Sequence, residues 1–427
     1  MNSSLPPSRD SGEARRGRPK KGKGKRRRGG QKGHVGAKRT LVPQDEVDEL
    51  VLCIPETCDK CGDRLDGHDP EPLRRQIVEL PPVKPHVTEH QFHSLKCRCG
   101  AVTRMPVPPR LQHGDFGPRL CALISLLSGA YRLSKRSIQT LLSEVLEINV
   151  ALGSVSNIEA RTSRALESAH GAALQEIRSA PFVNMDETSW SEGNSSCWLW
   201  VATTSDVAYY RIAPDRSASV VGDILGEAFA GIVGNDRAKA YLVLEPEQRQ
   251  LCWFHLGRNF QSKIELGGQD ATFGRQMRAF ERRLWRTQHL FEAGELERAT
   301  YTRRMKMLRG EVFRALSSWA RSGDPRVGVA AMSTNLLKLE SAMWTFVDNP
   351  HVDPTNNRAE RDIRHPVVWR RSSFGTDSER GSRFVERILT TVATCRKQRR
   401  SPFRFLTDVL TAVWAGREPA QLIPNTV

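Results

Sequence analysis

The sequence predicts an α/β fold in which one mixed sheet is interrupted by a long helical segment. Short runs rich in apolar, β-branched and aromatic residues predict four strands, at FVNMD, CWLWVATT, VAYYRIA and GIVGND. A helical pattern over residues 216–229 separates the third strand from the fourth. The order strand–strand–strand–helix–strand is that of a ribonuclease-H-like sheet, in which a helical crossover must connect strands that run parallel.

The chain of 427 residues is long enough for two or three domains, each with its own core. Changes in composition along the sequence suggest where these domains begin and end. We expect a basic disordered arm (1–45), a small cysteine-containing module (46–110), a helical connector (111–180), a catalytic domain in two pieces (181–255 and 346–400), a helical insertion between these pieces (256–345) and a C-terminal tail (401–427).

The charge balance favours a polyanionic partner. The formal net charge is +17, from 65 Lys and Arg against 48 Asp and Glu, and the pI is about 9.8. No apolar run is long enough to span a bilayer and no signal peptide opens the sequence, so we expect no membrane partner and a cytoplasmic location. Nine cysteines in a chain of this length do not make a disulfide framework.

The arm, up to about Thr40, is rich in Lys, Arg and Gly and has too few apolar side chains to fold alone. Arg16 and Arg18 lie in the segment RGRPKK, which resembles the core of an AT-hook. Such an extended segment binds a narrow A·T minor groove of DNA. The alternative is a solvated run of charge that contacts phosphates without sequence preference.

Two cysteine pairs, Cys58–Cys61 and Cys97–Cys99, are each followed by a glycine that allows the chain to turn around an ion. Four thiolates suit the tetrahedral preference of zinc, whereas free or buried cysteines are the alternative. RQIVEL and HVTEHQFHSLKC predict strands between the pairs, so we expect a zinc-ribbon-like module with one structural zinc ion. Three nearby histidines are substitute ligands: His68, His90 and His93. A closed site of this kind holds DNA or another protein and has no position open for catalysis.

The connector, residues 111–180, carries apolar residues at helical spacing. Ser134 is placed to cap a helix over SKRSIQTLLSEVLEI. The Leu-Gly pair in NVALGSVSN resembles the turn of a helix-turn-helix, which would make the next helix a recognition helix. A packed helix bundle is the alternative, and the lack of an obvious cluster of base-reading side chains favours it.

Three acidic residues lie where a nucleic-acid enzyme needs them. Asp186 ends the run PFVNMD, Asp236 ends AGIVGND, and Glu360 lies in the helical pattern PTNNRAERDIR. Phosphodiester cleavage aligns an attacking and a leaving oxygen, and two divalent cations about 4 Å apart stabilise both. Magnesium prefers carboxylate oxygens, so these residues are the candidate catalytic residues and ligands of two Mg²⁺ ions.

Other acids compete for these roles. Glu187 is a rival of Asp186, because neighbouring residues of a strand point to opposite faces and only one of the two faces the site. Further rivals are Asp223, Asp348, Asp353 and Asp362. The gap of 124 residues (360 − 236) is too long for the bare fold, which is why we expect an insertion over 256–345. Its charged helical sequence suits contact with DNA or a partner.

Five arginines flank Glu360 in the sequence: Arg358, Arg361, Arg364, Arg370 and Arg371. The first three recur every three residues and lie near one face of a helix. Planar guanidinium groups bind phosphates well, so we expect contacts with the DNA backbone, above all from Arg361 and Arg364. The alternative is an ordinary charged helix surface.

In order and variety, these segments resemble the transposases of the insertion sequence 66 family, a DDE-type group. The resemblance spans nearly the whole chain and rests on GGQKGHVG, CDKCG…CRCG, RQIVELPPVKPHV, FGPRL…RLSKRSIQ, MDET, NDRAKAY, CWFH and NNRAERDIRHPVVWRRSSFGTDSERGSRF. It implies that Asp186, Asp236 and Glu360 form the catalytic triad. It also places an insertion after Cys252 and His255, the position of the family's Cys-x-x-His motif. These two residues are either a core cysteine with a satisfied histidine or part of a metal site.

The sequence departs from the family at a few positions near the triad. Ser189 and Arg237 stand where the family commonly has glycine, and Arg371-Ser372 replaces a Lys-Asn pair. These changes concern the positioning of the site rather than the fold.

The resemblance implies a bacterial, nucleoid-associated DNA transposase that cleaves transposon ends and joins the freed 3′ hydroxyl to target DNA. Two ends imply a homodimer or larger assembly on double-stranded DNA, and accessory proteins of the same element are further candidate partners. One alternative is an inactive or repurposed transposase that acts as a DNA-binding protein. The other is a ribonuclease-H-like nuclease.

Overall fold

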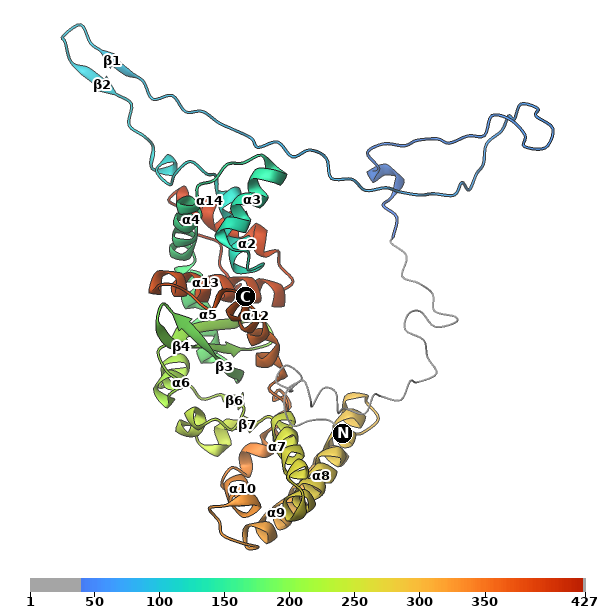
Figure 1. Cartoon of the computed structure of the whole chain (residues 1–427), viewed down its shortest axis with the longest axis vertical. Helices are drawn as coiled ribbons and strands as arrows, with labels where there is room; N and C mark the ends of the chain where they lie inside the picture. Colours follow the sequence, from blue (N-terminus) through green and yellow to red (C-terminus); the bar gives the residue numbers. More distant parts are fainter. Residues whose placement is uncertain (1–39, 425–427) are drawn as a thin grey trace. The chain divides into compact units, whose positions relative to one another are not determined.

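The computed structural model describes residues 40–424, so Arg16 and Arg18 of the basic arm lie outside the described residues. The chain divides after Lys84 into two compact units (Figure 1). None of the helices that the structure describes has the length and apolar character needed to cross a membrane.

The smaller unit, described over residues 40–84, has little regular structure. It contains the short 3₁₀ helix η1 (Gln44–Glu46) and a pair of hydrogen bonds between the Gln76 side chain and the backbone of Val42, both 2.8 Å long. The strand expected at RQIVEL is not formed, and Ile77 is 85% exposed. A strand is stable only beside a partner strand, and no other segment of residues 40–84 forms a strand beside this one.

The larger unit begins with a short antiparallel hairpin of strands β1 (Ser94–Lys96) and β2 (Val102–Arg104). The strand expected over HVTEHQFHSLKC is therefore confined to its last residues. All six paired residues are exposed, so the hairpin lacks a buried face that would extend it.

A five-stranded mixed sheet forms the centre of this unit. Its strands, in the spatial order β5-β4-β3-β6-β7, are β5 (Ala208–Ala213), β4 (Ser195–Thr203), β3 (Phe182–Glu192), β6 (Ile232–Asn235) and β7 (Arg249–Leu251). Strands β3, β4 and β5 are antiparallel neighbours, whereas β6 runs parallel to both β3 and β7. The helix α6 (Ala218–Leu225) lies between β5 and β6 in the chain, as the sequence predicts.

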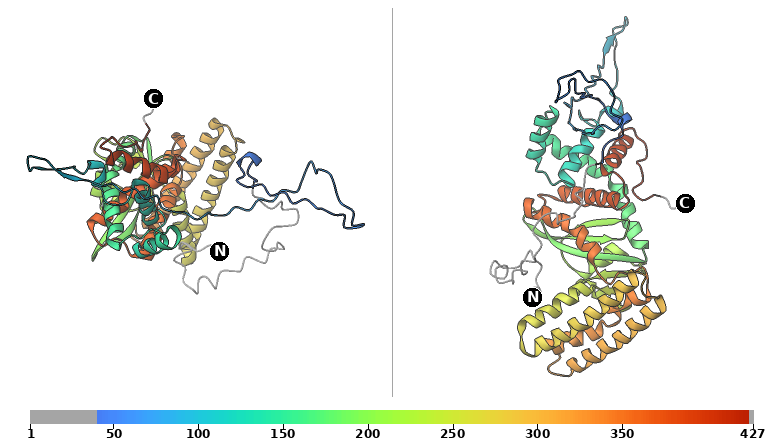
Figure 2. Two further views of the ribbon diagram at one scale, coloured as in Figure 1. Left: turned by 90° about the horizontal axis from the view of Figure 1, so that it is seen from above. Right: turned by 90° about the vertical axis from the view of Figure 1, so that its right-hand side faces the viewer.

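Helices from both ends of the unit pack against this sheet or against the helices that cover it (Figures 1 and 2). They are α2 (Pro118–Gly129), α3 (Lys135–Leu146), α4 (Leu152–Ala165), α5 (Glu167–Ser179), α12 (Asn357–Ser373), α13 (Glu379–Lys397) and α14 (Pro402–Trp414). Helix α12 packs against β3 and β4, and α13 packs against β5. Helix α14 packs against α2 and buries Phe405 and Leu406, so residues 401–427 hold a core helix that the expectation of a tail missed.

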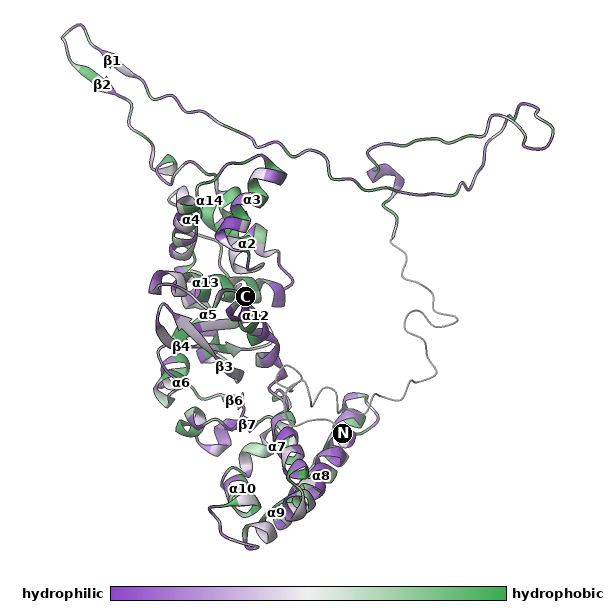
Figure 3. Cartoon of the chain, viewed as in Figure 1, coloured by the Kyte–Doolittle hydropathy of each residue, from purple (hydrophilic) through white to green (hydrophobic). Residues whose placement is uncertain are grey.

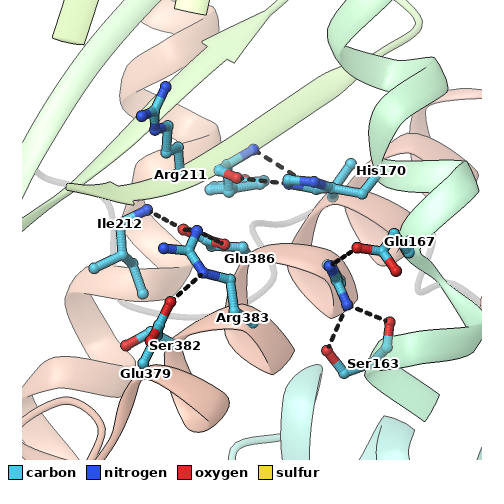
Figure 4. Close-up of polar contacts among 12 residues, drawn as sticks. Ser163, Glu167, His170, Arg211, Ile212, Glu379, Ser382, Arg383 and Glu386 are labelled. Atoms are coloured by element: carbon cyan, nitrogen blue, oxygen red, sulfur yellow. Dashed lines mark hydrogen bonds and ion pairs between the residues drawn. The ribbon is translucent and has the colours of Figure 1, made fainter. Parts of the chain in front are cut away.

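Helix α13 closes the β5 edge of the sheet with side chains. The backbone N–H groups of Ala208 and Tyr210 donate to the hydroxyls of Thr394 and Thr390, at 3.1 and 3.0 Å. The N–H of Ile212 donates to the buried carboxylate of Glu386 (Figure 4). Every second residue of the strand thus meets every fourth residue of the helix, and the donors that an edge strand leaves free are satisfied.

Helix α12 contains Pro366, which has no N–H to donate to the carbonyl of Asp362. The hydroxyl of the buried Tyr210 on β5 donates to that carbonyl instead, at 3.0 Å. The sheet therefore supplies the hydrogen bond that the helix lacks, and it fixes the helix at this point.

Between β7 and α12 the chain forms a group of helices with a core of its own. These are α7 (Trp253–Leu266), α8 (Gly268–Glu292), α9 (Arg298–Ala320), α10 (Gly328–Lys338) and the short α11 (Thr345–Asp348). Hydrophilic residues run along much of α8 (Figure 3). The N–H of Trp253 donates to the carbonyl of Pro354 at 3.0 Å, so the two ends of this helical segment are joined.

Candidate active site

Asp186 and Asp236 come from neighbouring parallel strands. Strand β3 pairs with β6 up to the register Asn184↔Gly234; Asp186 comes two residues later in β3, and Asp236 directly follows β6. Each side chain is fixed locally: Asp186 accepts from the N–H of Glu187 at 2.9 Å, and Asp236 accepts from the N–H of Ala238 at 2.7 Å. The two carboxylates are therefore held at the same edge of the sheet.

Glu360 lies in the first turn of α12, and this turn is fastened to β3. The side chain of Asn184 donates to Asn356 at 3.0 Å, and Asn356 in turn donates to the carbonyl of Met185 at 2.7 Å. Asn184 and Asn356 are both fully buried. Because Met185 precedes Asp186, the same contacts place Glu360 relative to the first aspartate.

The negative charges of the other two predicted carboxylates act on Asp186. Burial raises the pKa of Asp186 well above its usual range, and repulsion by three neighbouring carboxylates raises it further. These neighbours are Glu187, Asp236 and Glu360. A concentration of negative charge of this kind, built from hard oxygen donors, is a suitable environment for a divalent cation.

Glu187, the neighbour of Asp186, is buried and contacts Arg216 and Tyr241. Its side chain is 1% exposed, forms a close ion pair with Arg216 and accepts from the Tyr241 hydroxyl at 2.7 Å. Burial raises the pKa of Glu187, and Asp236 adds to this effect. Arg216 also lies 3.8 Å from Asp236, so it contacts both acids. Sequence reasoning did not identify Arg216 or Tyr241, since no local pattern links them to Glu187.

Cys252, His255 and Glu360 form a second group beside the aspartates. A ligand atom of each lies within 4.8 Å of the others. The Nδ1 atom of His255 is 3.3 Å from Oε1 of Glu360, and the guanidinium of Arg258 is 3.6 Å from the same oxygen. Burial lowers the pKa of His255, and Arg258 lowers it further. Sequence reasoning identified Cys252 and His255 as a motif but did not place Glu360 with them.

The arginines of α12 have different surroundings. Arg358 pairs with Asp353 at 3.0 Å, and Arg370 donates to the Ser189 backbone at 2.8 Å. Arg361, Arg364 and Arg371 are exposed. The latter three are thus available to an external partner, whereas Arg358 and Arg370 hold parts of the protein together.

The cysteine pairs lie in tight turns, one in each unit. In the smaller unit, the N–H of Gly62 donates to the carbonyl of Cys58 at 2.9 Å. In the larger unit, the N–H of Gly100 donates to the carbonyl of Cys97 at 2.9 Å, at the end of strand β1. Both glycines have positive φ angles, of 79° and 90°, which explains the need for glycine after each pair. Hydrogen bonds from the following residues, chiefly backbone N–H groups, lower the pKa of the Cys58 and Cys97 thiols.

Comparison with known proteins gives two family matches. A family model described as "Transposase IS66 family" matches residues 113–384, which is more than half of the chain. A second model, described as the zinc-finger binding domain of transposase IS66, matches residues 55–100 and thus includes both cysteine pairs. The chain is also 24% identical over 415 residues to "Uncharacterized protein y4qI" of Sinorhizobium fredii (strain NBRC 101917 / NGR234). That alignment covers 89% of this chain and 75% of the relative.

Proposed function

This chain belongs to the IS66 family of transposases, and we propose that it cuts DNA at transposon ends and joins the freed 3′ hydroxyl to target DNA. One observation carries the proposal: Asp186 on strand β3 is acted on by the negative charges of Asp236, which follows β6, and of Glu360 on α12. The sequence predicts this combination of three carboxylates from residues 186, 236 and 360.

The arrangement of the sheet supports a ribonuclease-H-like catalytic domain. Three antiparallel strands are followed by a helix and then by a strand parallel to the first. The helices α7–α11 lie between β7 and α12 in the chain. This order corresponds to a helical insertion between the second aspartate and the glutamate. The flanking helices α2–α5 and α14 form the surrounding layer.

Asp186, Asp236 and Glu360 would hold the divalent cations. The donor set fits, because carboxylate oxygens are preferred by magnesium and the crowded negative charge around Asp186 is relieved by a cation. Two such ions supply Lewis-acid stabilisation of the attacking and the leaving oxygen.

The protein's own residues position this chemistry. Asn184 and Asn356 fix the start of α12 against β3 and thereby orient Glu360. The positive charge of Arg216 offsets the negative charges of Glu187 and Asp236. Arg361 and Arg364, exposed on the helix of Glu360, bind backbone phosphates and hold the DNA in line with the carboxylates.

The N-terminal segments would hold transposon ends. Cys58, Cys61, Cys97 and Cys99 bind one structural zinc ion, and the arm with Arg16 and Arg18 contacts the DNA beside it. Synapsis of two ends requires a homodimer or larger assembly, with accessory proteins of the element as further partners. Such a protein works on the bacterial nucleoid, in the cytoplasm.

A nicking assay tests the proposal. Purified protein, Mg²⁺ and a labelled duplex carrying the transposon end should give a nick at the end of the element. Asp236→Ala should abolish nicking and leave binding of the duplex intact, whereas Asp223→Ala, which changes an exposed aspartate paired with Arg211, should retain both. Binding without nicking by the wild type would indicate a repurposed DNA-binding protein. Cutting of hybrid or branched substrates without regard to the end sequence would indicate a nuclease.

A further inference from the structure

We propose that Cys252, His255 and Glu360 form a second transition-metal site, distinct from the cysteine module and suited to zinc. The site joins the start of α7 to the start of α12. It does not depend on the proposed DNA chemistry, since it is defined by metal binding alone.

The geometry is close to that of a tetrahedral site. Atoms bound to zinc at about 2.0–2.3 Å lie roughly 3.3–3.8 Å from one another. The His255 Nδ1 and Glu360 Oε1 atoms are 3.3 Å apart, and the Cys252 sulfur lies within 4.8 Å of a ring nitrogen of His255 and of a carboxylate oxygen of Glu360. Small side-chain adjustments are sufficient to bring all three donors to one ion.

Two of these donors are buried and unsatisfied. Neither Nδ1 of His255 nor Oε1 of Glu360 has a hydrogen-bond partner, although each atom is buried. These two atoms lie 3.3 Å apart without a hydrogen bond, and among the described residues the only other charged group beside the Glu360 oxygen is Arg258, at the longer distance of 3.6 Å. A cation between the two atoms would satisfy both, because it accepts a lone pair from the imidazole nitrogen and one from the carboxylate oxygen.

The donor set selects the metal. One sulfur, one imidazole nitrogen and one carboxylate oxygen are characteristic of zinc and similar transition metals, whereas magnesium and calcium bind oxygen almost exclusively. Backbone N–H groups of Asn356 and His255 donate to the Cys252 sulfur, a contact that stabilises a metal-bound thiolate. The thiolate and the carboxylate together balance the charge of a divalent ion.

The site would act on the catalytic region through Glu360. Oε1 of this residue faces His255 and Arg258, so an ion there fixes one oxygen of the carboxylate and leaves the second for the aspartate side. Three protein donors also leave one position of the tetrahedron for water. Because it fixes one oxygen of Glu360, the ion would serve to position this residue.

The test is the zinc content of the full-length protein, purified without chelator and measured by elemental analysis. The wild type should bind about one more zinc ion per chain than His255→Ala, because the four-cysteine site remains in both. His255→Cys, which restores a zinc ligand, should regain the lost ion. Arg258→Ala removes the other neighbour of Glu360 Oε1 without removing a donor, and it should keep the wild-type content.

Cobalt substitution provides a second readout. The wild type and His255→Ala are both loaded with cobalt and their absorption spectra are subtracted. The difference spectrum should be that of a cobalt ion bound by a single thiolate. Equal zinc content and equal cobalt spectra in these two proteins would overturn the proposal. If His255→Ala does not fold, the double variant Cys58→Ser/Cys61→Ser decides the matter. Retention of a single-thiolate cobalt spectrum supports the site, and complete loss of metal refutes it.

Discussion

Asn184 and Asn356, which are 172 residues apart in the chain, share a buried hydrogen bond of 3.0 Å between Nδ2 and Oδ1. Asn184 belongs to the strand that carries Asp186, and Asn356 precedes the helix that carries Glu360. The bond lies at the point where the long helical segment returns to the sheet. The bond therefore positions Glu360 relative to Asp186, although the long helical segment separates them in the chain.

Replacement of Asn356 by alanine should uncouple Glu360 from the aspartates. The change removes the hydrogen bonds of Asn356 with the Asn184 side chain and the Met185 carbonyl, at a cost of about 1–3 kcal/mol in the free energy of unfolding; Asn184 still donates to the Thr355 carbonyl. Nicking should fall strongly while DNA binding persists, as measured by the nicking assay and a binding titration. Asn357→Ala, at the neighbouring and less buried position, is the control and should be close to wild type. Unchanged nicking by Asn356→Ala would contradict the positioning role.

Arg216→Ala should destabilise the protein by leaving Glu187 without its cation. Glu187 is almost completely buried and would retain the Tyr241 hydroxyl as its remaining side-chain donor, so we expect a loss of about 1–3 kcal/mol at pH 7. The loss should be smaller at acidic pH, where Glu187 takes up a proton and no longer needs the arginine. Denaturant melts at several pH values measure this. Arg211→Ala removes an exposed pair with Asp223 and should cost less than about 1 kcal/mol at any pH.

His170 should make the protein less stable in weak acid. Burial lowers the pKa of His170 from 6.5 to about 4, and its Nε2–H donates to the Tyr210 carbonyl at 2.9 Å (Figure 4). Because the unfolded chain binds this proton at higher pH than the folded one, stability is full above pH 6.5 and is lost as the pH falls towards 4. The loss amounts to at most roughly 3 kcal/mol.

Melting curves between pH 4 and pH 8 test this expectation. His170→Gln keeps a donor for the Tyr210 carbonyl and does not titrate, so the slope of stability against pH should become flatter. His289→Gln, at an exposed histidine on α8, should follow the wild type. A His170→Gln protein with an unchanged slope would show that other groups cause the acid sensitivity.

Arg361 and Arg364 should contribute to the salt dependence of DNA binding. Each phosphate contact contributes about 0.9 to the slope of log K against log salt concentration, so changing both residues to alanine should reduce the slope by about two. Affinity should fall for all sequences to a similar extent. The double variant Arg404→Ala/Arg417→Ala removes two exposed arginines on or after α14 and is the control. A slope equal to that of the wild type would place the DNA elsewhere.

The sequence predicted the local elements of the site better than the contacts between them. Asp186 ends an apolar run and Asp236 follows strand β6, so their proximity could be inferred from the order of the strands. Strand β3 itself continues to Glu192, beyond the predicted FVNMD. The segment QLCWFH, in contrast, changes from strand to helix after Leu251, because Cys252 caps helix α7 and His255 lies in its first turn. The aromatic and apolar residues there belong to the helical core rather than to the sheet.

The long-range partners could not be predicted, because they depend on how distant segments pack. Arg216 reaches Glu187 and Asp236 from the loop before α6, and nothing in the neighbouring sequence marks it. Likewise, Glu360 meets His255 through the packing of two helix starts. The family assignment from the sequence was confirmed, and it too gave no partner for Cys252 or His255.

The closed edges of the sheet restrict how two copies of this protein could associate. Thr390, Thr394 and Glu386 occupy the free donors of β5. At the opposite margin, the Thr345 hydroxyl donates to the β7 carbonyl of Arg249 at 2.6 Å. Growth of a continuous sheet from one copy into the next is therefore obstructed at both margins. A paired complex on two DNA ends would have to be built from helical faces and from the nucleic acid itself, which also protects an isolated copy from strand-mediated aggregation.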